Sequence, residues 1–194
     1  MSVEELTKFT NQFNLIHINS KFIRKCRAGD ESEAKSMVER DPRLTNKQDS
    51  DGATGLMATL LCKHHSLCRW LLSLPGLDTN LRDEDNFTAL HYACQWGAAL
   101  DIVITLATLS SWETVNGKDK WGGTALDWAA RCNNPSAALY LSWLGAECRE
   151  ENRKYSEVTL ETWIEAARFY PGLKQDSQCW AMAANDVRWI HKSS

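Results

Sequence analysis

Apolar residues recur along this chain at helical spacing, in pairs of short segments separated by a turn. In the clearest pair, residues 88–97 are followed by residues 100–109, and each segment places its apolar side chains three or four positions apart. Thr88 is a favoured N-cap residue, and Gly97 is typical of a helix C-terminus. The pattern therefore predicts two short amphipathic helices packed against each other.

The same pattern occurs again on both sides of this pair. Thr54 and Thr124 begin equivalent segments 34 residues before and 36 residues after Thr88. A weaker pair precedes them, and its predicted buried residues are Phe22, Ile23, Cys26, Ala34, Met37 and Val38. Self-similarity at a period near 33 residues indicates a stacked array of one helix–turn–helix unit, in which each unit covers its neighbour.

Turn residues place the boundaries of the predicted units. Gly52, Asn86 and Gly122 occupy matching positions before the three threonines, where the chain needs a left-handed backbone. Residues 44–48 are predicted to be an extended link, and the helix after Thr54 is predicted to continue to Lys63, with a turn at His64 and His65. The predicted organisation is an N-terminal helix or cap at 1–20, repeats at 21–48, 49–82, 83–118 and 119–148, and a helical C-terminal cap at 149–194.

The ends of the chain contain further helical patterns. A capping-box pattern at residues 2–5 predicts a short first helix. Residues 159–170 and 178–190 are predicted to be two helices that cover the last repeat, because a repeat array needs a terminal unit with a polar outer face. Trp163, Ile164, Trp180 and Val187 are the residues expected to dock.

The repeat resembles the ankyrin repeat family, whose unit reads Asp-x-x-Gly-x-Thr-Pro-Leu-His-x-Ala-Ala followed by a Gly. One unit matches this motif at Asn80, Asp83, Thr88, Leu90, His91, Ala93 and Gly97, and the next at Asp119, Gly122, Thr124, Leu126, Ala129, Ala130, Gly145 and Ala146. The resemblance implies an all-α solenoid of stacked helix pairs with short β-hairpin fingers. It also implies a concave face, formed by inner helices and fingers, that binds another protein.

Two motif positions depart from the family. Gly55, Ala89 and Ala125 occupy the proline position, so the preset first helical turn is lost. Met57 and Asp127 occupy the histidine position in two units. Because these residues link neighbouring turns in the family, a less stable array is expected.

Composition and charge exclude several classes of function. The net charge of −3 and a pI of about 6.0 argue against nucleic-acid binding, which needs a basic face. The longest helical apolar run, residues 102–106, is too short to span a membrane. Seven cysteines without framework spacing and an N-terminus without a secretory pattern favour a reduced protein of the cytoplasm or nucleus. No catalytic or phosphate-binding motif is found, so neither enzyme activity nor a cofactor is expected, and the chain alone is predicted to be monomeric.

The family's variable contact positions lie at the finger tips and at the exposed end of each inner helix. Here the predicted partner-binding residues are Glu84, Asp85, Phe87, Gln95, Trp96, Lys120, Trp121 and Arg131. Phe87, Trp96 and Trp121 are expected to lie where the core does not need them, and aromatic anchors dominate binding energy at interfaces. The alternative is that they cover neighbouring fingers within the stack. The acidic finger around Glu84 and Asp85 favours a basic partner.

Two more specific hypotheses concern a methyl-lysine cage and a metal site. Some histone lysine methyltransferases hold methyl-lysine in an aromatic cage on ankyrin repeats, and the matching positions here are Phe87, Tyr92 and Trp128, although Gln95 replaces the acid. This predicts, as an alternative function, a methyl-lysine or histone-tail reader. Cys62, His64, His65 and Cys68 are close in sequence, but they straddle a helix corner, and a structural zinc site needs four convergent ligands. No metal site is therefore predicted.

Overall fold

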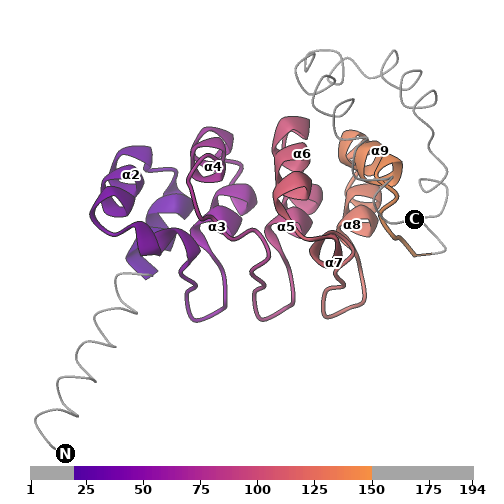
Figure 1. The fold of residues 1–194 in the computed structure, drawn as a ribbon, viewed down its shortest axis with the longest axis horizontal. Coiled ribbons are helices and arrows are strands. Elements are labelled where there is room, and N and C mark those ends of the chain that lie inside the picture. The colour runs from indigo at the N-terminus through magenta and orange to yellow at the C-terminus, as the bar shows by residue number, and fades with distance from the viewer. Residues whose placement is uncertain (1–19, 150–194) are drawn as a thin grey trace, which may run out of the picture.

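The computed structural model describes residues 20–149, and these form a single row of helix pairs with finger-like loops projecting from one edge (Figure 1). The helices predicted at residues 2–5, 159–170 and 178–190 lie outside the described residues, as do the docking residues Trp163, Ile164, Trp180 and Val187. Within residues 20–149, no helix is long and apolar enough to cross a lipid bilayer.

Each unit contributes an inner and an outer helix. The pairs are residues 20–28 with α2 (Glu31–Arg40), α3 (Gly55–Leu61) with α4 (His65–Leu72), α5 (Ala89–Trp96) with α6 (Leu100–Leu109), and α8 (Ala125–Arg131) with α9 (Pro135–Trp143). The inner helices α3, α5 and α8 lie closest to the fingers, and the outer helices lie farther from them (Figure 1). The predicted all-α solenoid is confirmed.

Two local predictions are wrong, and one short helix was not predicted. The residues predicted as an extended link begin inside a 3₁₀ helix, η1 (Pro42–Asn46), because Asp41 caps it and a proline starts it. Helix α3 ends at Leu61 because Lys63 turns left-handed at φ 60°, so α4 already begins at His65. The link after α6 contains a further short helix, α7 (Trp112–Val115), which Ser111 caps.

The apolar residues of the four pairs form one continuous core. Phe22, Ile23, Cys26, Ala34, Met37 and Val38 are buried, as the pattern predicts, and they belong to the same cluster as the residues of the later units. Helix α3 contacts α5, and α5 contacts α8, so the core runs along the row of inner helices. Because each unit buries its apolar side against its neighbours, the units depend on one another for stability.

Three threonines begin the inner helices in the same way. The side-chain oxygens of Thr54, Thr88 and Thr124 accept the backbone N–H three residues later. The reciprocal bond from the threonine N–H goes to His91 Nδ1 at 3.2 Å in α5 and to Asp127 Oδ2 at 2.9 Å in α8. Asp127 therefore replaces the family's histidine as a capping partner.

A ladder of asparagines joins one unit to the next. The side-chain oxygens of Asn46, Asn80 and Asn116 accept the backbone N–H groups of Asp78, Ser111 and Glu147, at 2.9, 2.8 and 2.8 Å. Each acceptor therefore lies about one repeat before its donor. These bonds satisfy backbone groups of the links, and they fix the spacing of successive fingers.

The fingers are tight turns, and within the described residues they contain only one isolated β-bridge, between Gln48 and Thr54, and no strand. The predicted β-hairpins are therefore reduced to two backbone bonds within each turn, such as Asp83 N–H to the Phe87 carbonyl and Asn86 N–H to the Asp83 carbonyl, both at 3.0 Å. Neighbouring fingers are tied by backbone bonds from Glu84 to Asp51 and from Lys120 to Asp85.

Candidate protein-binding surface

An aspartate shapes each finger. One carboxylate oxygen of Asp83 accepts the N–H groups of Asp85 and Phe87, both at 2.9 Å. Asp119 does the same with Trp121 and Gly123, both at 2.8 Å. Charge-assisted bonds of this kind are short and strong, so the finger tips are held in one conformation.

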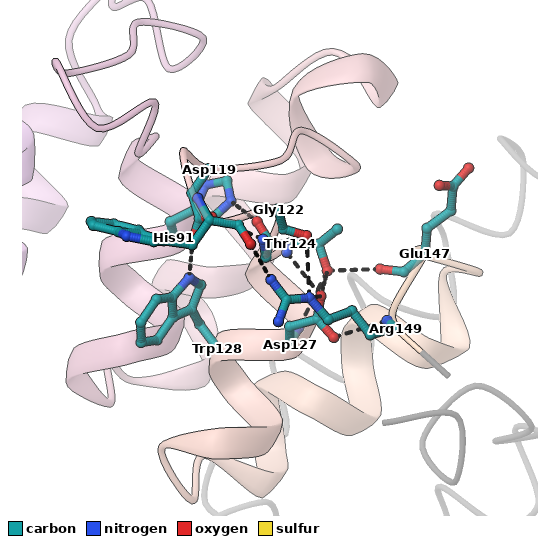
Figure 2. Close-up of polar contacts among 10 residues, drawn as sticks. His91, Asp119, Gly122, Thr124, Asp127, Trp128, Glu147 and Arg149 are labelled. Atoms are coloured by element: carbon teal, nitrogen blue, oxygen red, sulfur yellow. Dashed lines mark hydrogen bonds and ion pairs between the residues drawn. The ribbon is translucent and has the colours of Figure 1, made fainter. Parts of the chain in front are cut away.

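The second oxygen of each of these two aspartates holds an aromatic side chain on the inner helix. The Tyr92 hydroxyl donates to Asp83 Oδ2 at 2.8 Å, and the Trp128 indole N–H donates to Asp119 Oδ2 at 2.6 Å, as Figure 2 shows for Asp119. Burial raises the pKa of Tyr92, and the bond to Asp83 raises it further, so the phenol stays protonated. Each finger is thereby fastened to the concave side of its inner helix.

Phe87 lies at the centre of the aromatic cluster that results. Its ring centroid is 5.3 Å from that of His91, 5.5 Å from Tyr92, 5.4 Å from Trp128 and 6.0 Å from Trp121. The Tyr92 and Trp121 contacts are edge-on, a favourable arrangement for aromatic pairs. Phe87 is only 6% exposed, so the expectation that it lies outside the core is wrong. Phe87 packs between two fingers, as predicted by the alternative that these aromatic residues cover neighbouring fingers within the stack.

The two tryptophans chosen from the sequence are at the surface. Trp96, the last residue of α5, is 38% exposed, and Trp121, at the tip of the next finger, is 60% exposed. Of the other predicted contact residues, Glu84, Lys120 and Arg131 are exposed, and Asp85 and Gln95 are partly buried. Trp121 therefore lies against the buried cluster around Phe87, and Trp96 is a second exposed ring at the end of α5.

Cations of the chain itself lie over two of these rings. The Arg131 guanidinium is 5.1 Å from the Trp128 ring centroid, and Lys120 Nζ is 6.0 Å from that of Trp121. Both distances are within the range of cation–π attraction. Lys120 also pairs with Asp85 at 3.1 Å, so one of the two predicted acidic residues of the finger is already neutralised.

The three rings of the predicted cage do come together, but they leave no room between them. Phe87 is in direct contact with Tyr92 and with Trp128, and both of these are tied to aspartates. A cage needs rings that stand apart around a cation. The Arg131 guanidinium already lies over the Trp128 ring, so one of the three rings has a cation of the chain itself as its partner.

The four residues considered for a metal do not converge. Cys68 is buried, and burial raises the pKa of its thiol to about 12. His64 Nε2 lies 3.1 Å from the Arg27 carbonyl, in the contact between the first two units. Among residues 20–149, no group of three or more histidine, cysteine or acidic side chains is placed to hold a metal ion.

The sequence reasoning missed how the last finger is fastened. The backbone N–H of Arg149 donates to Asp127 Oδ1 at 2.9 Å, and its guanidinium donates to the carbonyls of Trp121 and Gly122 (Figure 2). Thr124 Oγ1 donates to the Glu147 carbonyl at 2.8 Å. The sequence did contain one sign of this arrangement, Asp127 at the family's histidine position. A carboxylate at that position can accept a backbone N–H from the link that follows the repeat.

A buried histidine makes the array sensitive to acid. His91 Nδ1 accepts the Thr88 N–H, and Nε2 lies 3.3 Å from the Gly123 carbonyl of the next finger. Burial lowers the pKa of His91 below its usual 6.5, so the unfolded chain binds a proton more readily than the folded chain. Acidification through pH 6.5 is therefore expected to lower the free energy of unfolding.

Denaturant melts at pH 7 and pH 5 measure this effect. His91→Gln should remove most of the loss of stability between these pH values. His65→Gln is the matched control: burial also lowers the pKa of His65, but this side chain is only partly buried and should contribute less. An unchanged pH dependence in His91→Gln would contradict the assignment.

Comparison with known proteins gives the family. Residues 22–116 match the model for ankyrin repeats, in three copies. The chain is also 30% identical, over 127 residues, to a protein of Oryza sativa subsp. japonica named Probable E3 ubiquitin-protein ligase XBOS32. That match covers 63% of this chain and 25% of the rice protein, so the chain spans about a quarter of its relative's length. Ankyrin repeats typically serve as non-catalytic modules that bind other proteins. The stacked helix pairs, the capping threonines and the family match together show that this chain belongs to the ankyrin repeat family and is a protein–protein interaction module.

Proposed function

We propose that the chain is an adaptor or inhibitor without catalytic activity, and that it binds a protein or peptide on the concave face formed by the inner helices and fingers. The observation that carries this proposal is the exposure of two tryptophans, Trp96 at the end of α5 and Trp121, which packs against the buried Phe87. Aromatic side chains on a rigid support lose little conformational entropy on binding, and they commonly dominate interface energies.

Several contacts hold the finger that carries Trp121 in one conformation. Asp119 holds the finger that carries Trp121, Arg149 binds two of its carbonyls, and Phe87 packs against the Trp121 ring. The surface is therefore largely formed before binding. A preformed surface favours affinity because little ordering remains to be done in the complex.

The acidic finger supports a basic group in the partner near Glu84. Asp83 is used by Tyr92 and by its own finger, and Asp85 is paired with Lys120. Glu84 and Asp51 remain exposed on adjacent finger tips. Their charge is expected to steer association, and this contribution should weaken as salt is added.

The remaining features of the proposal come from the sequence. We place the protein in the cytoplasm or nucleus, as a monomer before it binds its partner, with residues 149–194 closing the array. The buried thiols of Cys26, Cys68 and Cys94, whose pKa values burial raises, suit a reduced protein. The rice relative's name refers to a ligase, but no ligase activity is proposed here. The methyl-lysine reader is not favoured, because Phe87 is in direct contact with Tyr92 and Trp128, the other two rings of the predicted cage.

The test begins by identifying a partner through the proposed face. A photoreactive amino acid at Lys120 should cross-link the partner, which mass spectrometry then identifies. Trp96→Ala and Trp121→Ala should each weaken binding of that partner by about 30-fold, because truncation of an interface anchor costs about 2 kcal/mol. Both variants should keep the wild-type thermal stability, since neither ring is part of the buried core.

Trp112→Ala is the matched control. Trp112 is 53% exposed but lies on α7, in the link after α6, and not on an inner helix or a finger. This variant should bind normally. If Trp112→Ala weakens binding and the other two variants do not, the interface lies on the links and the concave face is excluded.

A further inference from the structure

The inner helix of the first unit presents a strongly basic surface. Residues 20–28 contain four cations, Lys21, Arg24, Lys25 and Arg27, and no acidic residue. Arg24 and Arg27 are exposed, and the side chains of Lys21 and Lys25 are 46% and 34% exposed. These four residues and Ala28 line one open hollow in the surface. A net charge of −3 for the whole chain conceals this local concentration of positive charge.

The two lysines are paired, but the two arginines are not. Lys25 contacts Asp30 at 2.8 Å, and Lys21 contacts Glu33 at 3.4 Å. Within residues 20–149, no carboxylate is paired with Arg24 or Arg27. The two guanidinium groups carry five N–H donors each, and none of these donors is paired with a carboxylate of the described residues.

Helix capping does not account for these arginines. The last carbonyls of the helix are already satisfied: that of Lys25 by the Asp30 N–H, that of Cys26 by the Gly29 N–H, and that of Arg27 by the ring of His64. The opposite side of the helix is anchored in the core through Phe22 and Cys26. Within residues 20–149, the guanidinium groups are therefore not used in capping this helix, while the backbone that carries them is held in place.

The basic surface lies on the same row of inner helices as the proposed tryptophan site, two units before α5. Arg27 is close enough to Tyr92 for its positive charge to lower the phenol's pKa, against the larger raising effects of burial and Asp83. Between them lies the inner helix α3, where Leu61 and Cys62 are partly exposed. The concave side thus passes from cations on the first unit, over a small apolar stretch, to the aromatic residues of the third and fourth units.

We propose that Arg24 and Arg27 form a subsite for an acidic peptide segment, whose Asp or Glu carboxylates bind the two guanidinium groups while another part of the same partner contacts Trp96. The inference rests on the proposed function and adds the chemistry of the partner. Guanidinium groups bind carboxylates with two parallel hydrogen bonds, which gives direction as well as charge. A nucleic acid fits less well, because it is charged along its whole length and would meet the exposed Asp51 and Glu84 of the neighbouring fingers, whereas a short acidic segment need place its charges only at the arginines.

A random peptide library displayed on phage and selected on the full chain tests the proposal. Selected peptides should be enriched in Asp and Glu. Synthetic copies should bind the Arg24→Gln/Arg27→Gln variant at least tenfold more weakly than wild type, and their affinity for wild type should fall as salt is added. Arg24→Lys/Arg27→Lys should retain part of the affinity, since it keeps the charge and loses the forked geometry.

Arg43→Gln provides the matched control, because Arg43 is exposed on η1 and paired with Asp41. It should bind the peptides as wild type does, and thermal melts should show all variants folded. A selection without acidic peptides, or acidic peptides that bind the double glutamine variant normally, overturns the proposal. So does a single-stranded oligonucleotide of equal charge that binds more tightly than the peptides.

Two outcomes separate this inference from the proposed function. If the selected peptides are not acidic but lose affinity on Trp96→Ala, the tryptophan face is an interface and the arginine subsite is wrong. If acidic peptides depend on Arg24 and Arg27 but not on Trp96 or Trp121, the arginine subsite stands and the tryptophan face is wrong.

Discussion

Replacement of Phe87 with alanine is expected to lower the free energy of unfolding by about 3 kcal/mol or more, as is usual for loss of a buried phenylalanine. Its ring contacts those of His91, Tyr92, Trp121 and Trp128, which belong to two successive units and to the finger between them. Removal leaves a cavity where those units meet. Because the stability of a repeat array depends on the interfaces between neighbours, one such cavity should loosen both units. Chemical denaturation followed by circular dichroism measures the effect.

Trp121→Ala is the comparison for Phe87→Ala within the same cluster. Trp121 touches Phe87 but is 60% exposed, so its removal opens no cavity and should change stability little. Equal losses in the two variants would mean that Trp121 is structural, and the proposed interface would then lose its main support. A stable Phe87→Ala variant would show instead that the cluster tolerates a cavity and that Phe87 is no more structural than the exposed rings.

The helices were predictable because their signals are local. Thr54, Thr88 and Thr124 each stand directly before an apolar helical pattern, and all three cap their helices as expected. Gly52, Asn86 and Gly122 all have positive φ at the matching finger positions. Such features depend on residues close in sequence, so one unit suffices to identify them.

The site was harder to predict because burial depends on neighbouring units. Phe87 occupies a position that varies freely in the family, and no pattern within its own unit shows that Trp121 and Trp128 of the next unit close over it. The net charge of the finger was hard to predict for the same reason. The acidic finger was evident from the sequence, but its neutralisation by Lys120, 35 residues later, was not. The unpaired arginines of the first unit were overlooked because that unit matched the family least.

The asparagine ladder could have been predicted from the sequence. Asn46, Asn80 and Asn116 repeat at the spacing of the units, and only Asn80 was assigned to the motif. Their shared role becomes clear from the hydrogen bonds to the following links. A polar residue that recurs at the repeat period indicates a hydrogen bond between units, because the same backbone group needs a partner in every unit.

Asp119→Ala is expected to be the most damaging change to a finger, with a loss of about 2 to 4 kcal/mol. This carboxylate accepts hydrogen bonds from Trp121, Gly123 and Trp128, and bonds to a charged group contribute about 1.5 to 3 kcal/mol each without being additive. The aspartate joins the finger to the inner helix, so its loss should free the tip that carries Trp121. Binding to the cross-linked partner should weaken as well.

A double-mutant cycle with Trp128→Phe isolates the bond between finger and helix. Phenylalanine keeps an aromatic ring in the cluster and lacks the indole N–H that Asp119 accepts. The coupling free energy between the two changes should be about 1 to 2 kcal/mol. Asp49→Ala serves as the control, because Asp49 accepts the N–H groups of Asp51 and Ala53 in the same way, while the position equivalent to Trp128 is Ala58. Asp49→Ala should therefore show no coupling to Trp128→Phe. A coupling near zero for Asp119 would mean that each finger is held by its own backbone and that the aromatic face is not fastened through the aspartates.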